Sequence, residues 1–194
     1  MDAPFPQPVP EAEAQLPPPA DVQRARARLE EGENLMARGR LDEALAALQD
    51  AVRLDPHYAP ARNKLGVCYA RRGQLELARQ EFTAAIAIDP QFVPAYSNLG
   101  NLHQEMGRLE EAAAAYQKAL QLDPDYPLAH HNLGVLYRRM GRISESVHHL
   151  KRAARLEHQG RYGAGDRESP AVARWRPLMW AAVVLLILYW WSTR

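Results

Sequence analysis

The chain has 194 residues, of which 47% are hydrophobic and 24% are charged, with a formal net charge of +1. This length allows one domain with appendages or a short repeat array, and the near-neutral charge gives no electrostatic case for nucleic-acid binding. The single cysteine, Cys68, excludes an intramolecular disulfide.

Residues 1–22 form a proline-rich segment that lacks the basic and apolar regions of a secretory signal peptide. Seven prolines fall between Pro4 and Pro19, which excludes a continuous helix and favours an extended, polyproline-like chain. We therefore expect a disordered arm. The composition leaves open whether this arm is a spacer or a proline-rich ligand for a partner domain.

Several residue types recur at a spacing of 34 along residues 25–158. Two glycine series, one alanine series and one Asp-Pro series share this spacing. Their members are Gly32, Gly66, Gly100 and Gly134; Gly39, Gly73, Gly107 and Gly141; Ala51, Ala85, Ala119 and Ala153; and Asp55-Pro56, Asp89-Pro90 and Asp123-Pro124. Independent series in one register identify an internal repeat.

Each series has a physical reason in a unit of two helices joined by a tight turn. A glycine inside a helix costs about 1 kcal/mol relative to alanine, so the first series marks places where another helix approaches the backbone closely. The second series matches the glycine that ends a helix, and the alanines leave room for a neighbouring helix. The Asp-Pro pairs end the second helix, and Pro60, Pro94 and Pro127 suit the first turn of the next helix.

These residues resemble the tetratricopeptide repeat (TPR) motif. The second unit carries Leu65-Gly66, Tyr69, Ala78, Phe82, Ala85 and Pro90, and the third carries Tyr96, Leu99-Gly100, Ala112, Tyr116, Ala119 and Pro124. The resemblance implies an all-α solenoid of about four helix-turn-helix repeats, at 25–58, 59–92, 93–126 and 127–158. The first repeat departs from the motif at Arg28 and Glu31 and the fourth at Ser146, as terminal repeats commonly do.

The resemblance also implies that the first helices of successive repeats line a concave groove that binds a peptide or protein. The groove residues expected from the register are Asn63, Val67, Arg71, Asn98, Asn101, His131, Asn132 and Arg138. Asn98 and Asn132 resemble the asparagine ladder in the repeats of O-linked N-acetylglucosamine transferases, whose amides hold a peptide backbone. An amide suits this task because it offers both a donor and an acceptor.

Other kinds of site are not expected. The carboxylate clamp of chaperone-binding repeats matches this sequence only at Asn98. The pairs His130-His131 and His148-His149 do not predict a metal site, because adjacent helical residues point about 100° apart and His131 and His148 lie at unequal distances from the turn. No nucleophile-base pair, phosphate-binding loop or metal signature is recognisable. We therefore predict no enzyme activity, no metal and no cofactor.

The last part of the chain differs in composition from the repeats. Residues 159–174 form a predicted flexible basic linker, which either contacts anionic headgroups or is simply solvated. Residues 178–191 contain no charged residue, glycine or proline, and tryptophans lie near both ends, at Trp175, Trp180, Trp190 and Trp191. Apolar residues between aromatic ends predict a transmembrane helix at 175–193.

From these features we predict a single-pass, tail-anchored membrane protein whose repeats face the cytoplasm. It acts as an adaptor or scaffold that binds a partner protein or peptide in the groove, with no nucleic acid as a partner. The alternative is a self-assembling homo-oligomer, either a structural subunit or an assembly factor of a membrane complex. That reading uses the fourth repeat, which has no obvious capping helix after Glu157, together with the anchor helix.

Overall fold

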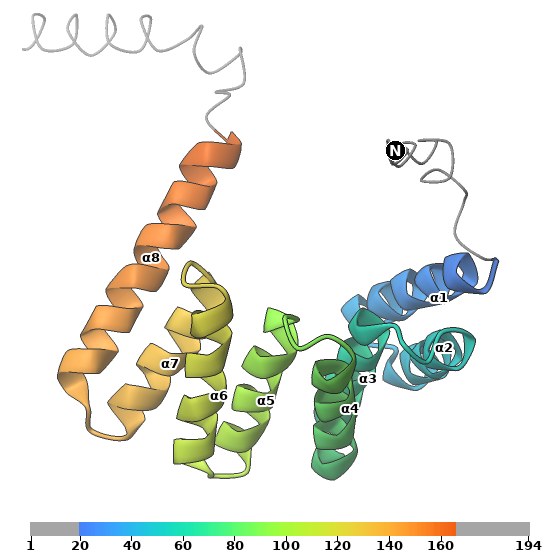
Figure 1. The fold of residues 1–194 in the computed structure, drawn as a ribbon, viewed down its shortest axis with the longest axis horizontal. Helices are drawn as coiled ribbons and strands as arrows, with labels where there is room; N and C mark the ends of the chain where they lie inside the picture. Colours follow the sequence, from blue (N-terminus) through green and yellow to red (C-terminus); the bar gives the residue numbers. More distant parts are fainter. Residues whose placement is uncertain (1–19, 166–194) are drawn as a thin grey trace, which may run out of the picture.

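The computed structural model describes residues 20–165, which form eight α-helices arranged as four hairpins (Figure 1). The helices are α1 (Ala20–Ala37), α2 (Leu41–Leu54), α3 (Ala59–Arg71), α4 (Leu75–Ile88), α5 (Val93–Glu105), α6 (Leu109–Leu122), α7 (Pro127–Arg139) and α8 (Ile143–Gly165). Residues 20–165 contain no strand. The predicted all-α repeat fold is therefore confirmed.

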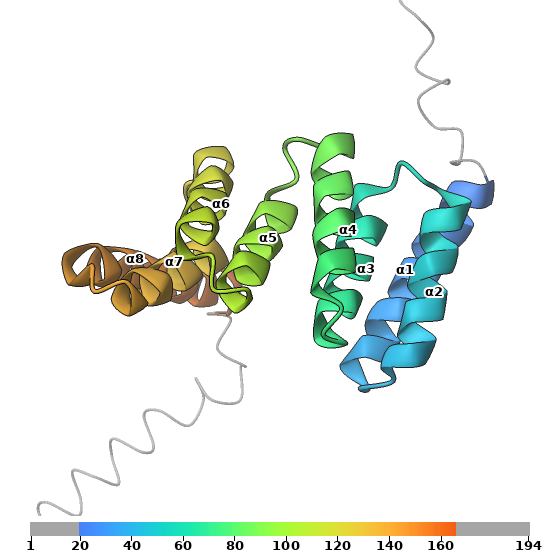
Figure 2. The same ribbon diagram turned by 90° about the horizontal axis from the view of Figure 1, so that it is seen from below.

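The hairpins stack in chain order into a curved array (Figures 1 and 2). Each helix contacts the next one along the chain, and the first helices of neighbouring repeats also touch, as α1 touches α3, α3 touches α5 and α5 touches α7. Within the described residues, the second helices α2, α4, α6 and α8 make no such contacts with one another. The first helices therefore line the inner side of the curve.

The predicted Asp-Pro turns separate one repeat from the next. Helices α2, α4 and α6 end one residue before Asp55, Asp89 and Asp123. Each of these carboxylates accepts a hydrogen bond from the backbone N–H two residues further on, at 3.0, 2.9 and 3.0 Å. A proline then occupies the first turn of α3, α5 and α7, where the missing N–H costs nothing.

The turn inside each hairpin depends on a glycine with left-handed backbone geometry. Gly107, between α5 and α6, has φ +76°. Its N–H donates to the Gln104 carbonyl at 3.2 Å, and the Arg108 N–H donates to the His103 carbonyl at 2.8 Å. A Cβ atom is disfavoured in this geometry. Each other hairpin turn also has a positive-φ glycine, which confirms the prediction for the second glycine series.

The interior glycines are sites of close contact between the two helices of a hairpin. A Cβ atom on Gly100 of α5 would lie 2.5 Å from Cε1 of Tyr116 on α6, and one on Gly66 of α3 would lie 2.7 Å from Cε1 of Phe82 on α4. Both rings are fully buried. Truncating a buried aromatic residue to alanine typically costs about 3–5 kcal/mol, so these ring-on-backbone contacts are major contributions to each hairpin.

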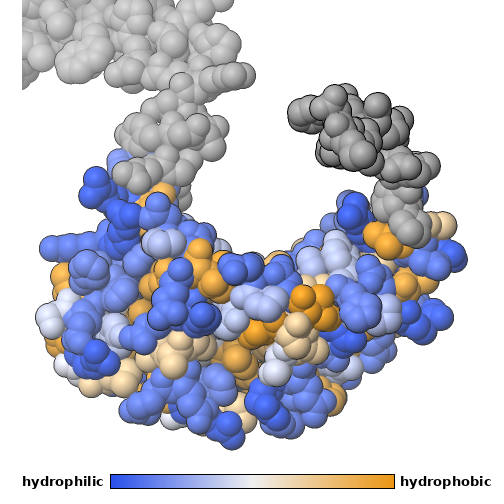
Figure 3. Space-filling view, in the orientation of Figure 1, coloured by the Kyte–Doolittle hydropathy of each residue, from blue (hydrophilic) through white to orange (hydrophobic). Residues whose placement is uncertain are grey.

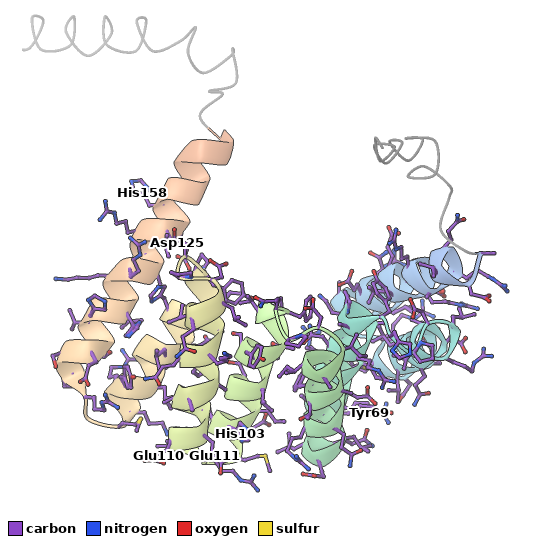
Figure 4. All side chains as sticks on the ribbon, in the orientation of Figure 1. Tyr69, His103, Glu110, Glu111, Asp125 and His158 are labelled. Atoms are coloured by element: carbon purple, nitrogen blue, oxygen red, sulfur yellow. The ribbon has the colours of Figure 1, made fainter. Side chains whose placement is uncertain are left out.

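A pair of histidines joins the helices of the fourth hairpin. Nδ1 of the buried His130 lies 2.9 Å from Nδ1 of His149 on α8, and Nε2 of His130 donates to the Pro124 carbonyl at 3.0 Å. The ring of Tyr137 packs against His149, with centroids 5.6 Å apart. Because the Pro124 carbonyl can only accept, Nδ1 of neutral His130 is the acceptor and His149 is the donor. Nearby, Arg152 of α8 pairs with Asp125 (Figure 4).

The last helix continues further than the sequence predicts. α8 has 23 residues and reaches Gly165, beyond residue 158 and into the segment expected to be a linker. Charged residues along α8, including Lys151 and Arg155, make it too polar to lie across a bilayer.

The predicted membrane location is wrong. Among residues 20–165, no helix is both long and apolar enough to cross a membrane, so the single-pass location with the repeats facing the cytoplasm is contradicted. The predicted span at 175–193, residues 1–19 of the arm and residues 166–174 of the linker lie outside the described residues.

The close contact at Gly100 gives a first prediction. Gly100→Ala should lower the free energy of unfolding by about 1–3 kcal/mol, the usual cost of overpacking, because the new Cβ collides with the Tyr116 ring. Urea denaturation followed by circular dichroism measures this change. Helix propensity alone would raise stability by about 0.5–1 kcal/mol. A more stable Gly100→Ala variant would therefore disprove the contact.

The histidine pair makes stability depend on pH. Burial, with the charges of His130 and His148 nearby, lowers the pKa of His149 below its ordinary value of 6.5, so the folded state keeps this imidazole neutral. The unfolded chain takes up the proton more readily, and hence the free energy of unfolding should fall as the pH drops below about 6.5.

Urea denaturation at several pH values between 7 and 5 measures the effect. His149→Gln should show a weaker pH dependence than the wild type. His131→Gln, which changes an exposed neighbour, is the control and should keep the wild-type dependence. Equal pH dependence in all three proteins would show that the pair is not responsible.

Candidate functional site

The inner side of the array is the candidate site. Figure 3 shows a curved molecule that is hollowed between its first hairpin and α8, with hydrophilic residues over most of the visible face. The first helices α1, α3, α5 and α7 contact one another in series along the array. Side chains at equivalent positions of these helices therefore follow one another along the groove.

A polar link crosses each junction between neighbouring first helices. Nζ of Lys64 on α3 lies 2.6 Å from the Glu33 carboxylate on α1. Nδ2 of Asn98 on α5 donates to Oδ1 of Asn63 on α3 at 2.9 Å. Nδ2 of Asn132 on α7 donates to Oδ1 of Asn101 on α5 at 2.8 Å. In the 34-residue register Lys64, Asn98 and Asn132 are equivalent, so one position ties each repeat to the one before it.

A pocket of about 370 Å³ opens between α3 and α5. Its lining consists of Val67, Ala70, Arg71, Phe82, Asn98, Asn101, Leu102 and Glu105. Four of the predicted groove residues thus meet at one place. The other four lie elsewhere: Asn63 is buried, at 3% exposure, beneath the Asn98 amide, and His131, Asn132 and Arg138 lie further along the groove on α7.

The two asparagines of the pocket present opposite hydrogen-bonding groups. Asn98 uses its Nδ2 on Asn63, which leaves its Oδ1 as an acceptor. Asn101 uses its Oδ1 twice, accepting from Nδ2 of Asn132 at 2.8 Å and from the Tyr116 hydroxyl at 2.6 Å, which leaves its Nδ2 as a donor. One acceptor and one donor, three residues apart on α5, match the N–H and C=O groups of an extended peptide.

The position of the Asn101 amide depends on a buried hydroxyl. Tyr116 is fully buried, and burial raises the pKa of its phenol, so the hydroxyl stays protonated and donates to Asn101. The repeat motif includes Tyr116 but does not predict its hydrogen bond to Asn101. Ala70, Phe82 and Leu102 are not among the residues predicted for the groove, although the 34-residue register was the signal that could have located them.

Charged side chains flank the pocket. The exposed Arg71 donates through Nη1 to the Met36 carbonyl of α1 at 3.3 Å, which holds its guanidinium at the junction. Glu105 is exposed on the α5 side and has no ion pair among the described residues. Further along, Arg138 and Arg139 of α7 are exposed and also unpaired within residues 20–165. The groove therefore carries both signs of charge.

Residue types that bind metals or act as nucleophiles occur within residues 20–165, among them His103 and Cys68. No group of three or more His, Cys, Asp or Glu residues within the described range could hold a metal ion. Nδ1 of His103 lies 3.0 Å from the Glu111 carboxylate near the α5–α6 turn (Figure 4), and burial lowers the pKa of His103. Burial also raises the pKa of the Cys68 thiol, which makes this thiol a poor nucleophile.

The chain is similar to solved structures with the same architecture. It is 28% identical to MamA, with a TM-score of 0.61, over 73% of this chain and 82% of that one. It is 26% identical to pilF of Pseudomonas aeruginosa, with a TM-score of 0.66, over 79% and 66% of the two chains. The first TPR of Spaghetti (RPAP3), bound to the HSP90 peptide SRMEEVD, is 24% identical with a TM-score of 0.58, over 62% and 95%, and shows likeness of fold alone.

Family models cover most of the described residues, although no curated protein matches the chain. A model described as tetratricopeptide repeat matches residues 35–102, one described as TPR repeat matches 105–141, and another described as tetratricopeptide repeat matches 131–164. With the 34-residue register and the stacked hairpins, these matches show that the chain belongs to the tetratricopeptide repeat family.

Proposed function

We propose that this protein is an adaptor that binds an extended segment of a partner protein along its inner groove. The observation that carries the proposal is the pocket between α3 and α5, where Asn98 offers an acceptor and Asn101 offers a donor. Both amides are already oriented by neighbouring side chains. A peptide backbone therefore meets fixed partners and little further ordering is needed on the protein side.

The pocket walls indicate what kind of segment fits. Val67, Phe82 and Leu102 form an apolar floor, which suits a small apolar side chain of the partner. Arg71 and Glu105 at the rim suit flanking residues of opposite charge. The partner segment is thus an extended chain with an apolar residue between charged ones.

Recognition of a C-terminal carboxylate by a clamp has no support here. The clamp needs a lysine and an asparagine where this chain has Leu128 and Val67, and Leu128 is 57% exposed at the groove end of α7. The Spaghetti structure, which holds the peptide SRMEEVD, supports peptide binding by this fold. It does not extend to the same ligand, because Leu128 stands where the clamp has a lysine that would hold the carboxylate.

Removing the ladder amides tests the proposal directly. Peptides selected from a random library for binding to the full chain provide a labelled probe, and fluorescence anisotropy gives its Kd. Asn98→Ala and Asn132→Ala should each weaken binding by roughly fivefold, because one hydrogen bond contributes about 1 kcal/mol. Asn34→Ala, which removes an exposed amide at the N-terminal end of the array, is the matched control. Unchanged affinity in both groove variants would place binding on another surface.

The buried hydroxyl under Asn101 gives a second test. Tyr116→Phe keeps the ring on Gly100 but removes the hydroxyl that donates to Asn101. The free energy of unfolding should therefore fall by about 1 kcal/mol, and the free energy of peptide binding should weaken by about the same amount. Tyr137→Phe is the matched control, because its hydroxyl accepts from Gln117 at 2.8 Å rather than supporting the pocket. It should lose similar stability but keep full affinity. Equal affinity losses in the two variants would refute a positioning role for Tyr116.

A further inference from the structure

The outer face of α8 leaves apolar side chains uncovered at the C-terminal end of the array. Ile143 is 58% exposed and Val147 is 44% exposed. In the 34-residue register they are equivalent to Leu109 and Ala113 of α6. Ala113 is buried against Leu133 and its neighbours on α7, and Leu109 packs against the same cluster. The α8 face is therefore built like a junction, although no described helix follows it.

The other end of the array is built differently. Three repeats earlier than Leu133 and Leu136, the equivalent positions on α1 are Glu31 and Asn34, and both are exposed. Glu31 pairs with Arg28 at 2.7 Å. The exposed face of α1 is thus polar and well solvated by water, whereas the exposed face of α8 carries apolar side chains. This asymmetry implies that something apolar covers α8.

A second copy of the chain is a poor cover. The exposed face of α8 continues from Val147 to Lys151 and Arg155, which are exposed and form no ion pair within the described residues. Symmetric pairing of two α8 faces would enclose Lys151 and Arg155 of both copies in one interface, without an ion-pair partner on this face. Stacking head to tail would instead set Ile143 and Val147 against the polar positions of α1, Glu31 and Asn34. Neither arrangement therefore covers Ile143 and Val147 with a fully apolar surface.

The chain itself contains a segment with the required chemistry. Residues 178–191 are apolar and uncharged, so they bring no like charge to Lys151 or Arg155. As a helix, these 14 residues would be about 21 Å long, close to the distance of about 20 Å along α8 from Ile143 to Leu156. The first helices α3, α5 and α7 have 13 residues each, which is nearly the same length.

The connection also permits this placement. Twelve residues, 166–177, separate the end of α8 from residue 178, and any chain of 12 residues has a root-mean-square reach of about 19 Å when it is a flexible coil. The end of α8 at Gly165 lies about 14 Å along the helix axis from Leu156. A segment that starts near Leu156 and runs antiparallel to α8 would end beside Ile143.

We propose that residues 178–191 dock on the outer face of α8 and take the place of the first helix of a fifth repeat. The docked segment covers Ile143 and Val147 as α7 covers Leu109 and Ala113. This contact goes beyond peptide binding, because it lies at the end of the array and not in the groove. Peptide affinity and docking therefore succeed or fail independently.

Tryptophan fluorescence of the full chain tests the docking selectively. All four tryptophans, Trp175, Trp180, Trp190 and Trp191, lie outside residues 20–165, so the emission reports only on the tail. In Ile143→Glu the emission should shift to longer wavelength and acrylamide should quench it more strongly. Leu77→Glu, which places the same charge at an exposed apolar position of α4, is the matched control and should leave the emission unchanged.

A spin label gives a second measurement, in which Ile143 and Val147 of the α8 face are left unchanged. A nitroxide on Ser144→Cys, beside the face, should quench the tryptophan emission, whereas one on Gln80→Cys of α4 should not; both sites are exposed, and Cys68 is buried. Far-UV circular dichroism confirms that each variant folds.

Three results would overturn the proposal. In the first, both glutamate variants change the emission equally, which indicates that residues 178–191 have no specific docking site on α8. In the second, quenching by the Ser144→Cys label disappears on dilution, which indicates contact between chains. In the third, the wild-type emission shifts on addition of phosphatidylcholine vesicles while the Ser144→Cys label has no effect, which indicates a tail that prefers lipid to α8.

Discussion

The contact between an aromatic ring of one helix and a glycine backbone of the other fixes the geometry on which the array depends. Tyr116 rests on Gly100 and Phe82 rests on Gly66, at distances that leave no room for a Cβ atom. The same two rings also serve the groove: Phe82 lines the floor of the pocket, and the Tyr116 hydroxyl orients Asn101. Packing and the shape of the groove are therefore coupled, because the side chains that close each hairpin also shape the surface on its inner side.

The sequence predicts the repeat well because each recurring spacing has a local cause. A positive-φ glycine, an Asp-Pro turn and a small residue under a neighbouring helix each impose a geometry within a few residues of themselves. Those geometries recur unchanged at Gly107, Asp89 and Ala85 and at their equivalents. Stacking of identical units then follows, since each hairpin has an apolar side that only another hairpin can cover.

Details of the groove needed the structure because they depend on which atoms are already bonded. The register places Asn63 and Asn98 on the inner face, but it cannot show that Asn63 is buried and accepts from Asn98. The same holds for Asn101, whose Oδ1 accepts two hydrogen bonds and whose Nδ2 donates none within residues 20–165. Val67, Arg71, Asn98 and Asn101 do meet at one pocket. The role of the predicted groove residues in binding stays a prediction.

Long-range side-chain contacts and the last helix lay beyond sequence reasoning for another reason. The contact between His130 and His149 links residues at unequal distances from the turn, and long side chains can lean along a helix by about a turn. The predicted membrane location rests on an apolar stretch with tryptophans near both ends, yet an apolar stretch indicates only a need for burial. Lipid, a partner or the rest of the chain can meet that need.

A repeat array has two different ends, and the chemistry of each end determines what it can contact. At the first end, Glu31 and Asn34 replace the leucines of an internal junction, and ion pairs such as Arg28 with Glu31 complete a polar surface. At the last end, Ile143 and Val147 keep the apolar character of a junction. Within the part of the chain that the structure describes, the exposed face of α8 therefore keeps the chemistry of a junction between repeats, whereas the exposed face of α1 has the chemistry of a surface in contact with water.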